Sequence, residues 1–329
     1  MIAPFFPFRA LPATMWLYLA VLVGLYLIIR WYRERQTVGN LREKYVFITG
    51  CDTGFGNKLA RQLDIQGLRV LAACLTKEGA EELERLTSNR LKVTILDVTS
   101  TESVKAATEW VKGIVGSKGL WGLVNNAGIG GSSGPNEWLT KDDFAKVINV
   151  NLLGLIDVTL HLLPLVRAAR GRIVNVASSF GRVTCIGGGY SPSKYGVEAF
   201  SDSLRRELLP FGVRVSIIEP GGFATSIGLT IRESIKGMWD QVSSDIKETY
   251  GQQYFESYYK TLQDLVKDAN PNLCMVTDCM EHALTSQYPR TRYSAGWDAK
   301  LFYIPLSYMP TFLADCVLAR FGPKPAQAV

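Results

Sequence analysis

Residues 45–56 read YVFITGCDTGFG, and this stretch decides the fold. A short apolar run leads into a loop with three glycines, and a helical pattern begins directly after the loop. The glycines permit a tight turn and let backbone N–H groups approach a pyrophosphate, whose negative charge the start of the helix favours. The stretch therefore predicts a strand, a phosphate-binding turn and a helix. Its candidate cofactor-binding residues are Thr49, Gly50, Asp52, Gly54, Phe55 and Gly56.

Downstream of this loop, short apolar runs alternate with longer helical patterns. The predicted strands are residues 45–49, 68–74, 91–96, 120–124, 172–176 and 214–219. The predicted helices between them are residues 57–66, 77–86, 101–115, 141–170 and 189–209. Because the runs are apolar on both faces, they indicate a parallel sheet that helices cover on both sides. We therefore predict an α/β fold with a doubly wound, Rossmann-like parallel sheet in a single domain, which binds ligands at the carboxyl ends of its strands.

A tyrosine and a lysine open the helix that follows the fifth strand, in the sequence YSPSK at residues 190–194. Residues four apart share one face of a helix, so the Lys194 ammonium is expected to lie near the Tyr190 phenol. The ordinary pKa of tyrosine, about 10, is too high for a base at neutral pH, and a neighbouring cation lowers it. The pair predicts that Tyr190 is a general base that takes the proton of an alcohol.

These features together resemble the short-chain dehydrogenase/reductase superfamily. The loop has the spacing TGxxxGxG, the fourth strand ends in NNAG at residues 125–128, and YxxxK follows the fifth strand. The resemblance implies hydride transfer between an alcohol and a nicotinamide cofactor, with Lys194 on the cofactor ribose and Asp97 on the adenine. The further cofactor-binding residues that it implies are Val98, Asn125, Ala127 and Gly128 near the adenosine half, and Pro220, Gly221 and Thr225 around the nicotinamide carboxamide.

The resemblance also implies a serine that binds the substrate oxygen together with Tyr190. Ser178 matches by its place in the motif, although it lies twelve residues before Tyr190, where many superfamily members have thirteen. That longer count falls on Ala177, which has no hydroxyl, so Ser178 is preferred and Ser179 is the alternative. Asn151 resembles the asparagine that positions a water in the proton relay behind the lysine. The alternative reading of Asn151 is a polar residue that kinks its helix.

Longer stretches narrow the resemblance to one branch of the superfamily. KYVFITGCDTGFGNKLARQLD, SKYGVEAFSDSLRREL and MEHALTSQYPRTRYSAGWDAK are similar to microsomal retinol dehydrogenases and oxidative 3α- and 17β-hydroxysteroid dehydrogenases. This similarity implies NAD-dependent oxidation of retinols and hydroxysteroids at the endoplasmic reticulum membrane. Gly222 and Ala224 depart from the branch, which commonly has an aromatic and a basic residue at these places, so regiochemistry stays open. An NADPH-dependent carbonyl reductase of retinal or ketosteroids is the alternative function.

The choice of cofactor depends on the charges near the glycine loop and the second strand. The 2′-phosphate of NADP needs a positive partner there, and Asp52 would repel it. The second strand ends at Cys74 without the acidic residue typical of many NAD enzymes, and Arg69 and Lys77 are cations nearby in the sequence. We predict NAD, with NADP as the alternative.

Residues 10–29 are almost wholly apolar and carry no charge. As a helix they would span about 30 Å, the thickness of a bilayer core. We predict that residues 1–36 form an N-terminal membrane anchor and its flank, and a cleaved signal peptide is the alternative. Arg30, Arg33 and Arg35 follow the span and Arg9 precedes it, which favours a cytoplasmic catalytic domain over a lumenal one. Met1 and Met15 are both candidate translation starts.

The remaining chain, residues 37–329, is predicted to be the catalytic domain. Within it, residues 223–270 follow the nicotinamide segment and are rich in aromatic and aliphatic side chains, as expected of a lid over a lipophilic substrate. Residues 298–329 contain the apolar stretch LFYIPLSYMPTFL, which is too short and too interrupted by proline to span a bilayer. We predict that this segment lies at the membrane surface beside the substrate pocket.

Composition excludes several other kinds of protein. The net charge of +6 includes no dense basic tract, so no nucleic-acid partner is predicted. The six cysteines lack metal-ligand spacing and are interpreted as free thiols. With only His161 and His282 available, we predict no metal site and no Ser-His-Asp triad. An inactive cofactor-binding scaffold is disfavoured because Tyr190 and Lys194 are both present, and the oligomeric state stays open.

Overall fold

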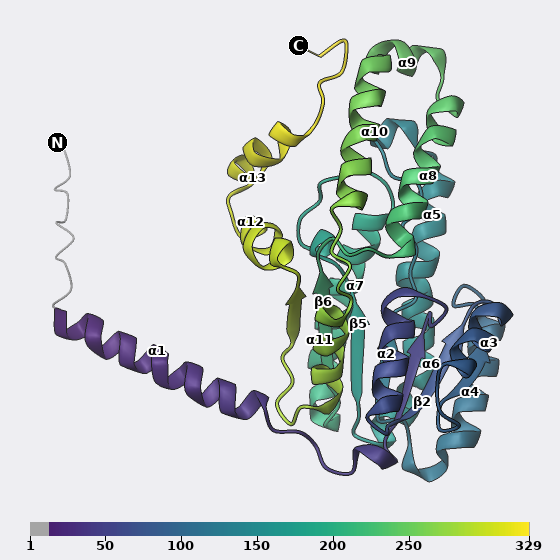
Figure 1. Cartoon of the computed structure of the whole chain (residues 1–329), viewed down its shortest axis with the longest axis vertical. Coiled ribbons are helices and arrows are strands. Elements are labelled where there is room, and N and C mark those ends of the chain that lie inside the picture. The colour runs from purple at the N-terminus through teal and green to yellow at the C-terminus, as the bar shows by residue number, and fades with distance from the viewer. Residues whose placement is uncertain (1–12, 329) are drawn as a thin grey trace.

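Seven parallel strands form one sheet in the order β3-β2-β1-β4-β5-β6-β7, in a computed structural model that describes residues 13–328 (Figure 1). The strands are β1 (Tyr45–Thr49), β2 (Arg69–Cys74), β3 (Lys92–Ile95), β4 (Gly122–Asn125), β5 (Arg172–Val176), β6 (Arg214–Pro220) and β7 (Arg292–Ala295). The predicted doubly wound sheet is confirmed, and all six predicted strands are present. β7 was not predicted, because its four residues, RYSA, alternate between buried and partly buried and lack a long apolar run.

Helices cover both faces of the sheet. One face carries α2 (Gly54–Ile65), α3 (Lys77–Arg85) and α11 (Cys274–Thr285), and the other carries α4 (Thr101–Val115), α6 (Leu155–Ala168) and α7 (Tyr190–Leu208). Ile48 packs with Leu59 and Met280 in the first layer, whereas Phe47 packs with Leu162 in the second. Since adjacent strand residues point to opposite faces, a strand covered on both sides carries apolar side chains on both faces, as residues 46–48 of β1 do.

The long helix predicted over residues 141–170 is divided into three parts. α5 (Lys141–Ile148) and α6 are joined by a π-helical segment, residues 149–154, which contains Asn151. The stretch Lys141–Ala168 is long and apolar enough to cross a membrane, but 39% of its most apolar part is buried inside the protein. Its apolar character therefore reflects packing against the sheet, and the π segment marks a place where π-helices often serve a functional site.

The predicted lid, residues 223–270, forms a helical layer beyond the carboxyl ends of the strands. It consists of α8 (Ser226–Gln241), α9 (Ser244–Tyr250) and α10 (Gln252–Lys267), which rise at the top of Figure 1. An isolated bridge between Phe223 and Asn270 closes its base, where the Ala224 N–H donates to the Asn270 carbonyl at 3.0 Å. The helices of this layer therefore start and end at one point beside β6.

Two apolar segments lie outside the sheet and its helices. α1 (Ala13–Glu34) projects from the body, and within it Thr14–Glu34 is long and apolar enough to cross a membrane and is not buried (Figure 1). Residues 1–12 of the predicted anchor, including Arg9, lie outside the described residues. The C-terminal segment has a π-helical turn at residues 299–303, then α12 (Ile304–Leu306) and α13 (Thr311–Leu318). It exposes the large apolar side chains of Leu301, Tyr308 and Phe312.

Replacing Gly171 with alanine tests how closely β4 and β5 must approach. A Cβ at Gly171 would lie 2.4 Å from the Trp121 carbonyl oxygen and 2.7 Å from the Leu120 carbonyl oxygen, so the backbone must shift. We expect Gly171→Ala to destabilise the fold by about 1–3 kcal/mol, measured as a lower midpoint of urea unfolding. Gly113→Ala is the control: Gly113 lies within α4 with open space around it, so that change should raise stability by up to about 1 kcal/mol. Equal midpoints for the two variants would contradict the close approach.

Candidate active site

A cavity of about 400 Å³ opens at the carboxyl ends of the strands, beneath α8 and α10. Its lining comes from the loops that follow β1, β2, β3, β4, β5 and β6, together with the base of the lid and Tyr303. In an open parallel sheet, ligands bind at the place where the strand order reverses, which here lies between β1 and β4. The cavity therefore occupies the position that the predicted fold assigns to its ligands.

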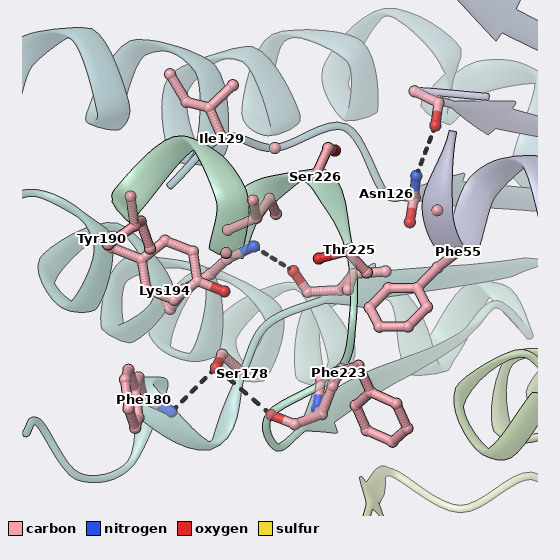
Figure 2. A pocket seen from close by; sticks show the side chains of 18 of the residues that line it. Phe55, Asn126, Ile129, Ser178, Phe180, Tyr190, Lys194, Phe223, Thr225 and Ser226 are labelled. Atoms are coloured by element: carbon pink, nitrogen blue, oxygen red, sulfur yellow. Dashed lines mark hydrogen bonds between the residues drawn. The ribbon is translucent and has the colours of Figure 1, made fainter. Parts of the chain in front are cut away.

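The glycine loop is held in place by residues that follow β4. The Thr49 hydroxyl accepts hydrogen bonds from the backbone N–H groups of Asn126 and Ala127, each at 3.0 Å. The Asn126 amide donates in turn to the carbonyl oxygens of Thr49 at 2.9 Å and Gly50 at 3.0 Å (Figure 2). Asn126 was missed as a site residue, although the NNAG motif contains it.

The loop fits the pyrophosphate of a dinucleotide. Gly50 and Gly54 have φ values of 68° and 65°, a conformation that side chains other than glycine rarely adopt. A Cβ at Gly56 would lie 2.3 Å from the Gly50 carbonyl oxygen, so the turn requires glycine there. Thr53 precedes α2 and its side chain caps no N–H of the first turn, which leaves those donors facing the loop for an anion.

Most of the predicted cofactor-binding residues line the cavity. They are Gly50, Asp52, Gly54, Phe55, Asp97, Val98, Ala127, Gly128, Pro220, Gly221 and Thr225, and Tyr190 and Lys194 join them. Thr49 and Gly56 support the loop from behind. Asn125 does not line the cavity, and its side chain turns into the sheet and donates to Thr159 and Asn175, each at 2.8 Å. Adjacent strand residues face opposite sides, so Asn126 reaches the loop and Asn125 does not.

Asp52 reaches across to the end of β2. Its carboxylate accepts hydrogen bonds from the backbone N–H groups of Leu75 and Thr76, each at 2.9 Å, and from the Thr76 hydroxyl at 2.8 Å. A fixed carboxylate thus lies at the end of the second strand, although the strand itself supplies no acidic residue. Many dinucleotide-binding folds place a carboxylate at this point, where it binds ribose hydroxyls.

Of the two cations considered near the cofactor, Arg69 lies at the amino ends of the strands, away from the carboxyl ends where the cavity opens. It is the first residue of β2, and its guanidinium donates to the Tyr45 hydroxyl and the Arg42 carbonyl at the amino ends of the strands. Lys77 is the first residue of α3 and lies on the same side as Asp52. Of the three charged residues considered from the sequence, only Asp52 and Lys77 therefore lie near the carboxyl end of β2.

Tyr190, Lys194 and Ser178 meet at the floor of the cavity. Tyr190 is the first residue of α7 and Lys194 lies one turn later, with its Nζ 5.6 Å from the centre of the Tyr190 ring. The Lys194 ammonium donates to the Val176 carbonyl at 2.8 Å, which anchors it to the end of β5. Figure 2 shows the Tyr190 ring between Lys194 and Ser178. The arrangement places a phenol, a hydroxyl and a cation on one wall.

Burial has the largest effect on the pKa values of Tyr190 and Lys194. It raises the pKa of the Tyr190 phenol, and the hydrogen bond with Ser178 opposes that increase. It also lowers the pKa of Lys194 to about 8. The expected effect of Lys194 is not among the causes that act on the pKa of Tyr190, and the ammonium is hydrogen-bonded to the Val176 carbonyl. Both groups are therefore biased toward their neutral forms.

The structure favours Ser178 over Ser179 as the hydroxyl beside the base. Ser178 Oγ accepts from the Phe180 N–H at 3.1 Å and lies 3.5 Å from the Pro220 carbonyl, to which it donates. Its hydrogen bond acts on the pKa of Tyr190, whereas Ser179 has no such effect. Ser178 thus joins the end of β5, the end of β6 and the start of α7 despite its twelve-residue spacing from Tyr190.

Asn151 supports the site from outside the cavity. It is buried in the π-helical segment, where its Oδ1 accepts from the Ile129 N–H at 2.8 Å and its Nδ2 donates to the Ile129 carbonyl at 2.9 Å. Nδ2 also donates to the Ser193 hydroxyl at 3.1 Å, and Ser193 donates to the Tyr190 carbonyl. Asn151 therefore fixes both the loop after β4 and the first turn of α7.

The outer part of the cavity is mainly apolar, and the sequence did not single out most of its residues. Phe180 and Tyr303 form an edge-to-face pair with ring centres 5.4 Å apart. Further lining residues are Ile129, Ile186, Phe223, Ile227, Ile231, Leu262, Leu265 and Val266. Only their apolar character distinguishes them in the sequence, so their common cavity follows from the fold rather than from a motif.

Comparisons with known proteins agree with this geometry. Residues 44–236 match the family model for short chain dehydrogenases. The chain is 62% identical over 317 residues to "Retinol dehydrogenase 7" of Rattus norvegicus and to "17-beta-hydroxysteroid dehydrogenase type 6" of Homo sapiens, covering 96% of this chain and 100% of each relative. A short-chain dehydrogenase/reductase of Burkholderia phymatum, solved with NAD, has a TM-score of 0.67 at 21% identity, covering 87% of this chain and 97% of that chain.

This chain belongs to the short-chain dehydrogenase family, and it is an oxidoreductase of the alcohol dehydrogenase type that uses a nicotinamide cofactor. The family model covers the glycine loop, the residues after β4 and the Ser178–Tyr190–Lys194 group. The solved structure supports the fold over most of the chain.

Replacing Ser178 with alanine tests its contact with Tyr190. A base acts in its deprotonated form, so kcat/KM for alcohol oxidation falls as pH drops through the pKa of Tyr190. The hydrogen bond with Ser178 lowers that pKa, so Ser178→Ala should move the acidic limb of the profile to higher pH. Ser179→Ala is the matched control and should leave the limb in place. A shift in the Ser179 variant alone would assign the role to Ser179 instead.

Proposed function

We propose that the protein oxidises the hydroxyl group of retinols and of 3α- and 17β-hydroxysteroids with NAD. The observation that carries the proposal is the group of Ser178, Tyr190 and Lys194 at the floor of a mainly apolar cavity. A polar floor suits the reacting hydroxyl, and apolar walls suit a lipophilic carbon skeleton. Two similar proteins, a retinol dehydrogenase and a 17-beta-hydroxysteroid dehydrogenase, act on the same substrate classes and support the proposal.

In this mechanism the substrate hydroxyl lies between the Ser178 hydroxyl and the deprotonated Tyr190 oxygen. Tyr190 takes the hydroxyl proton as the carbon loses its hydride, and the carbon–oxygen bond becomes a carbonyl. The oxidised nicotinamide, when bound, accepts the hydride and adds positive charge beside the phenol. That charge opposes the burial that raises the pKa of Tyr190.

Lys194 and Asn151 act behind the base. The Lys194 ammonium is held near the phenol by the Val176 carbonyl, and its lowered pKa of about 8 lets it gain or lose a proton near neutral pH. A Cβ at Gly128 would lie 3.3 Å from Asn151 Oδ1 and 3.7 Å from Lys194 Nζ, so both groups border the same point. We infer that this point serves the relay through which the Tyr190 proton leaves.

The position of Asp52 supports NAD over NADP. Its carboxylate is fixed at the end of β2, where it suits two ribose hydroxyls and repels a 2′-phosphate. Arg69, one of the two cations considered as partners for such a phosphate, lies at the amino ends of the strands, away from the cofactor loop. An NADPH-dependent reductase is therefore the less favoured function.

We also propose that the enzyme is anchored in the endoplasmic reticulum membrane by α1, with its catalytic domain on the cytoplasmic side. The exposed apolar surface of α1 and the cluster of Arg30, Arg33 and Arg35 at its end support this orientation. The exposed side chains of Leu301 and Phe312 suit contact with the membrane surface. Because Tyr303 of the same segment lines the cavity, a lipophilic substrate would enter from the membrane beside it.

Replacing Tyr190 with phenylalanine tests the mechanism. The change removes the only atom that takes the proton, so we expect kcat to fall by about 10²- to 10⁴-fold while NAD affinity stays nearly unchanged. Tyr195→Phe, at an exposed position on the same helix, is the control and should retain activity. Substantial turnover by Tyr190→Phe would refute Tyr190 as the base.

Replacing Asp52 with asparagine tests the choice of cofactor. Asparagine keeps the shape but removes the charge, so the ratio of kcat/KM for NAD to that for NADP should fall about tenfold or more, because like charges near a protein surface repel by about 1–4 kcal/mol. Asp142→Asn, an exposed change on α5, controls for net charge. A wild-type enzyme that prefers NADP, or an unchanged ratio in Asp52→Asn, would contradict the role of this carboxylate.

A further inference from the structure

A second cavity, of about 160 Å³, lies at the amino ends of β6 and β7, whereas the active site lies at the carboxyl ends of the strands. Four arginines line it: Arg205 and Arg206 in the last turn of α7, Arg214 at the start of β6 and Arg290 before β7. Its remaining lining residues are Leu209, Val213, Val215, Ser216, Pro289 and Thr291, so no acidic side chain belongs to it among residues 13–328. This cavity is here called the arginine pocket.

The positive charge of the arginine pocket is only partly neutralised. Arg290 pairs with Glu34, and Arg205 pairs with Asp202 at 3.2 Å while its buried Nε has no hydrogen-bond partner in the described part of the chain. Arg206 and Arg214 form no ion pair with any residue between 13 and 328, and both are exposed. The two exposed, unpaired guanidinium groups of Arg206 and Arg214 therefore remain for an anion.

The charge of Arg214 also acts on a buried neighbour. The pKa of Arg172 is lowered to about 10, mainly by burial, and repulsion from the positive charge of Arg214 is a smaller cause in the same direction. An anion beside Arg214 would relieve this repulsion. The guanidinium group presents a planar set of donors that matches the oxygens of a phosphoryl group, so the pocket has the chemistry of a phosphate site.

The arginine pocket adjoins the end of α1. Arg290, in its wall, donates through Nε to Glu34 at 2.7 Å, and the neighbouring Gln287 N–H donates to the Gln36 carbonyl at 2.7 Å. The guanidinium of Arg33 lies 4.1 Å from the centre of the Tyr288 ring. In Figure 1 the loop between α11 and β7, which contains Gln287, Tyr288 and Arg290, lies at the bottom of the body, where α1 joins it. The pocket is thus within a few residues of the point where the apolar helix ends.

We propose that the arginine pocket binds the phosphoryl group of an anionic phospholipid in the leaflet where α1 ends. The inference rests on the proposed membrane anchoring of α1. Exposed Trp31 and Tyr32 mark the interface end of that helix, so headgroup phosphates lie at the level of the pocket. Basic pockets beside membrane helices bind lipid headgroups in this way, with each arginine contributing about 1 kcal/mol. The lipid would fix the orientation of the catalytic domain on the membrane.

The test uses the full chain held in phosphatidylcholine nanodiscs. Binding of the soluble short-chain lipid dihexanoylphosphatidic acid is measured by calorimetry at constant ionic strength, beside inorganic phosphate. The double variant Arg206→Gln/Arg214→Gln should lose affinity for the lipid by about fivefold for each arginine. The double variant Arg85→Gln/Lys105→Gln removes the same charge from α3 and α4 and should bind as the wild type does.

Three results would overturn the proposal: no lipid binding, an equal loss in both double variants, or inorganic phosphate binding as tightly as the lipid. The last result would assign the pocket to a free anion. Flotation of the full chain with phosphatidylcholine vesicles tests the anchor separately. A chain that binds the lipid through these arginines but does not float would refute the anchoring and retain the site. The unfolding midpoint of each variant shows that it is folded.

Discussion

The hydrogen bonds between Thr49 and the residues after β4 fix the one point of the sheet on which the rest of the site depends. Gly50 and Gly54 give the loop freedom to adopt many conformations, so the loop needs an external restraint. Thr49 and Asn126 supply this restraint through hydrogen bonds that join the end of β1 to the end of β4. Because all of these bonds lie behind the loop, its front surface of backbone N–H groups is left for a ligand.

A second set of contacts ties the C-terminal segment to the same site. Asp298 accepts from the Gly222 N–H at 2.6 Å, directly after the turn expected to hold the nicotinamide. A Cβ at Gly221 would lie 2.2 Å from the Asp298 carboxylate, so this approach requires glycine, whereas Gly222 would tolerate a side chain. Tyr303 packs against Phe180, two residues after Ser178. The exposed apolar segment is therefore joined to both sides of the cavity, so a change in the position of this segment would alter the geometry of the site.

The sequence predicted what depends on short-range pattern. The glycine loop and the Tyr190–Lys194 pair are defined by local spacing, and the structure places both as expected. The Asn126 side chain reaches the loop and the Asn125 side chain does not, because adjacent residues at the end of β4 point in opposite directions, a detail that the motif does not contain. Three features could not be predicted in this way, because each depends on residues distant in sequence that only tertiary packing brings together. They are the position of Asp52 at the end of β2, the apolar lining from α8 and α10, and the pairing of β7 with β6.

The burial that suits a lipophilic substrate also determines how the base works. Apolar walls remove water from Tyr190 and Lys194, which raises the pKa of the phenol and lowers that of the ammonium. Burial therefore opposes the phenolate form of Tyr190, and positive charge that enters the cavity would favour it. The oxidised form of a nicotinamide carries that charge and the reduced form does not. A dry cavity of this kind thus couples the proton on Tyr190 to the charge of a bound cofactor: a phenolate beside the oxidised form would suit alcohol oxidation, and a phenol beside the reduced form would suit the reverse reaction.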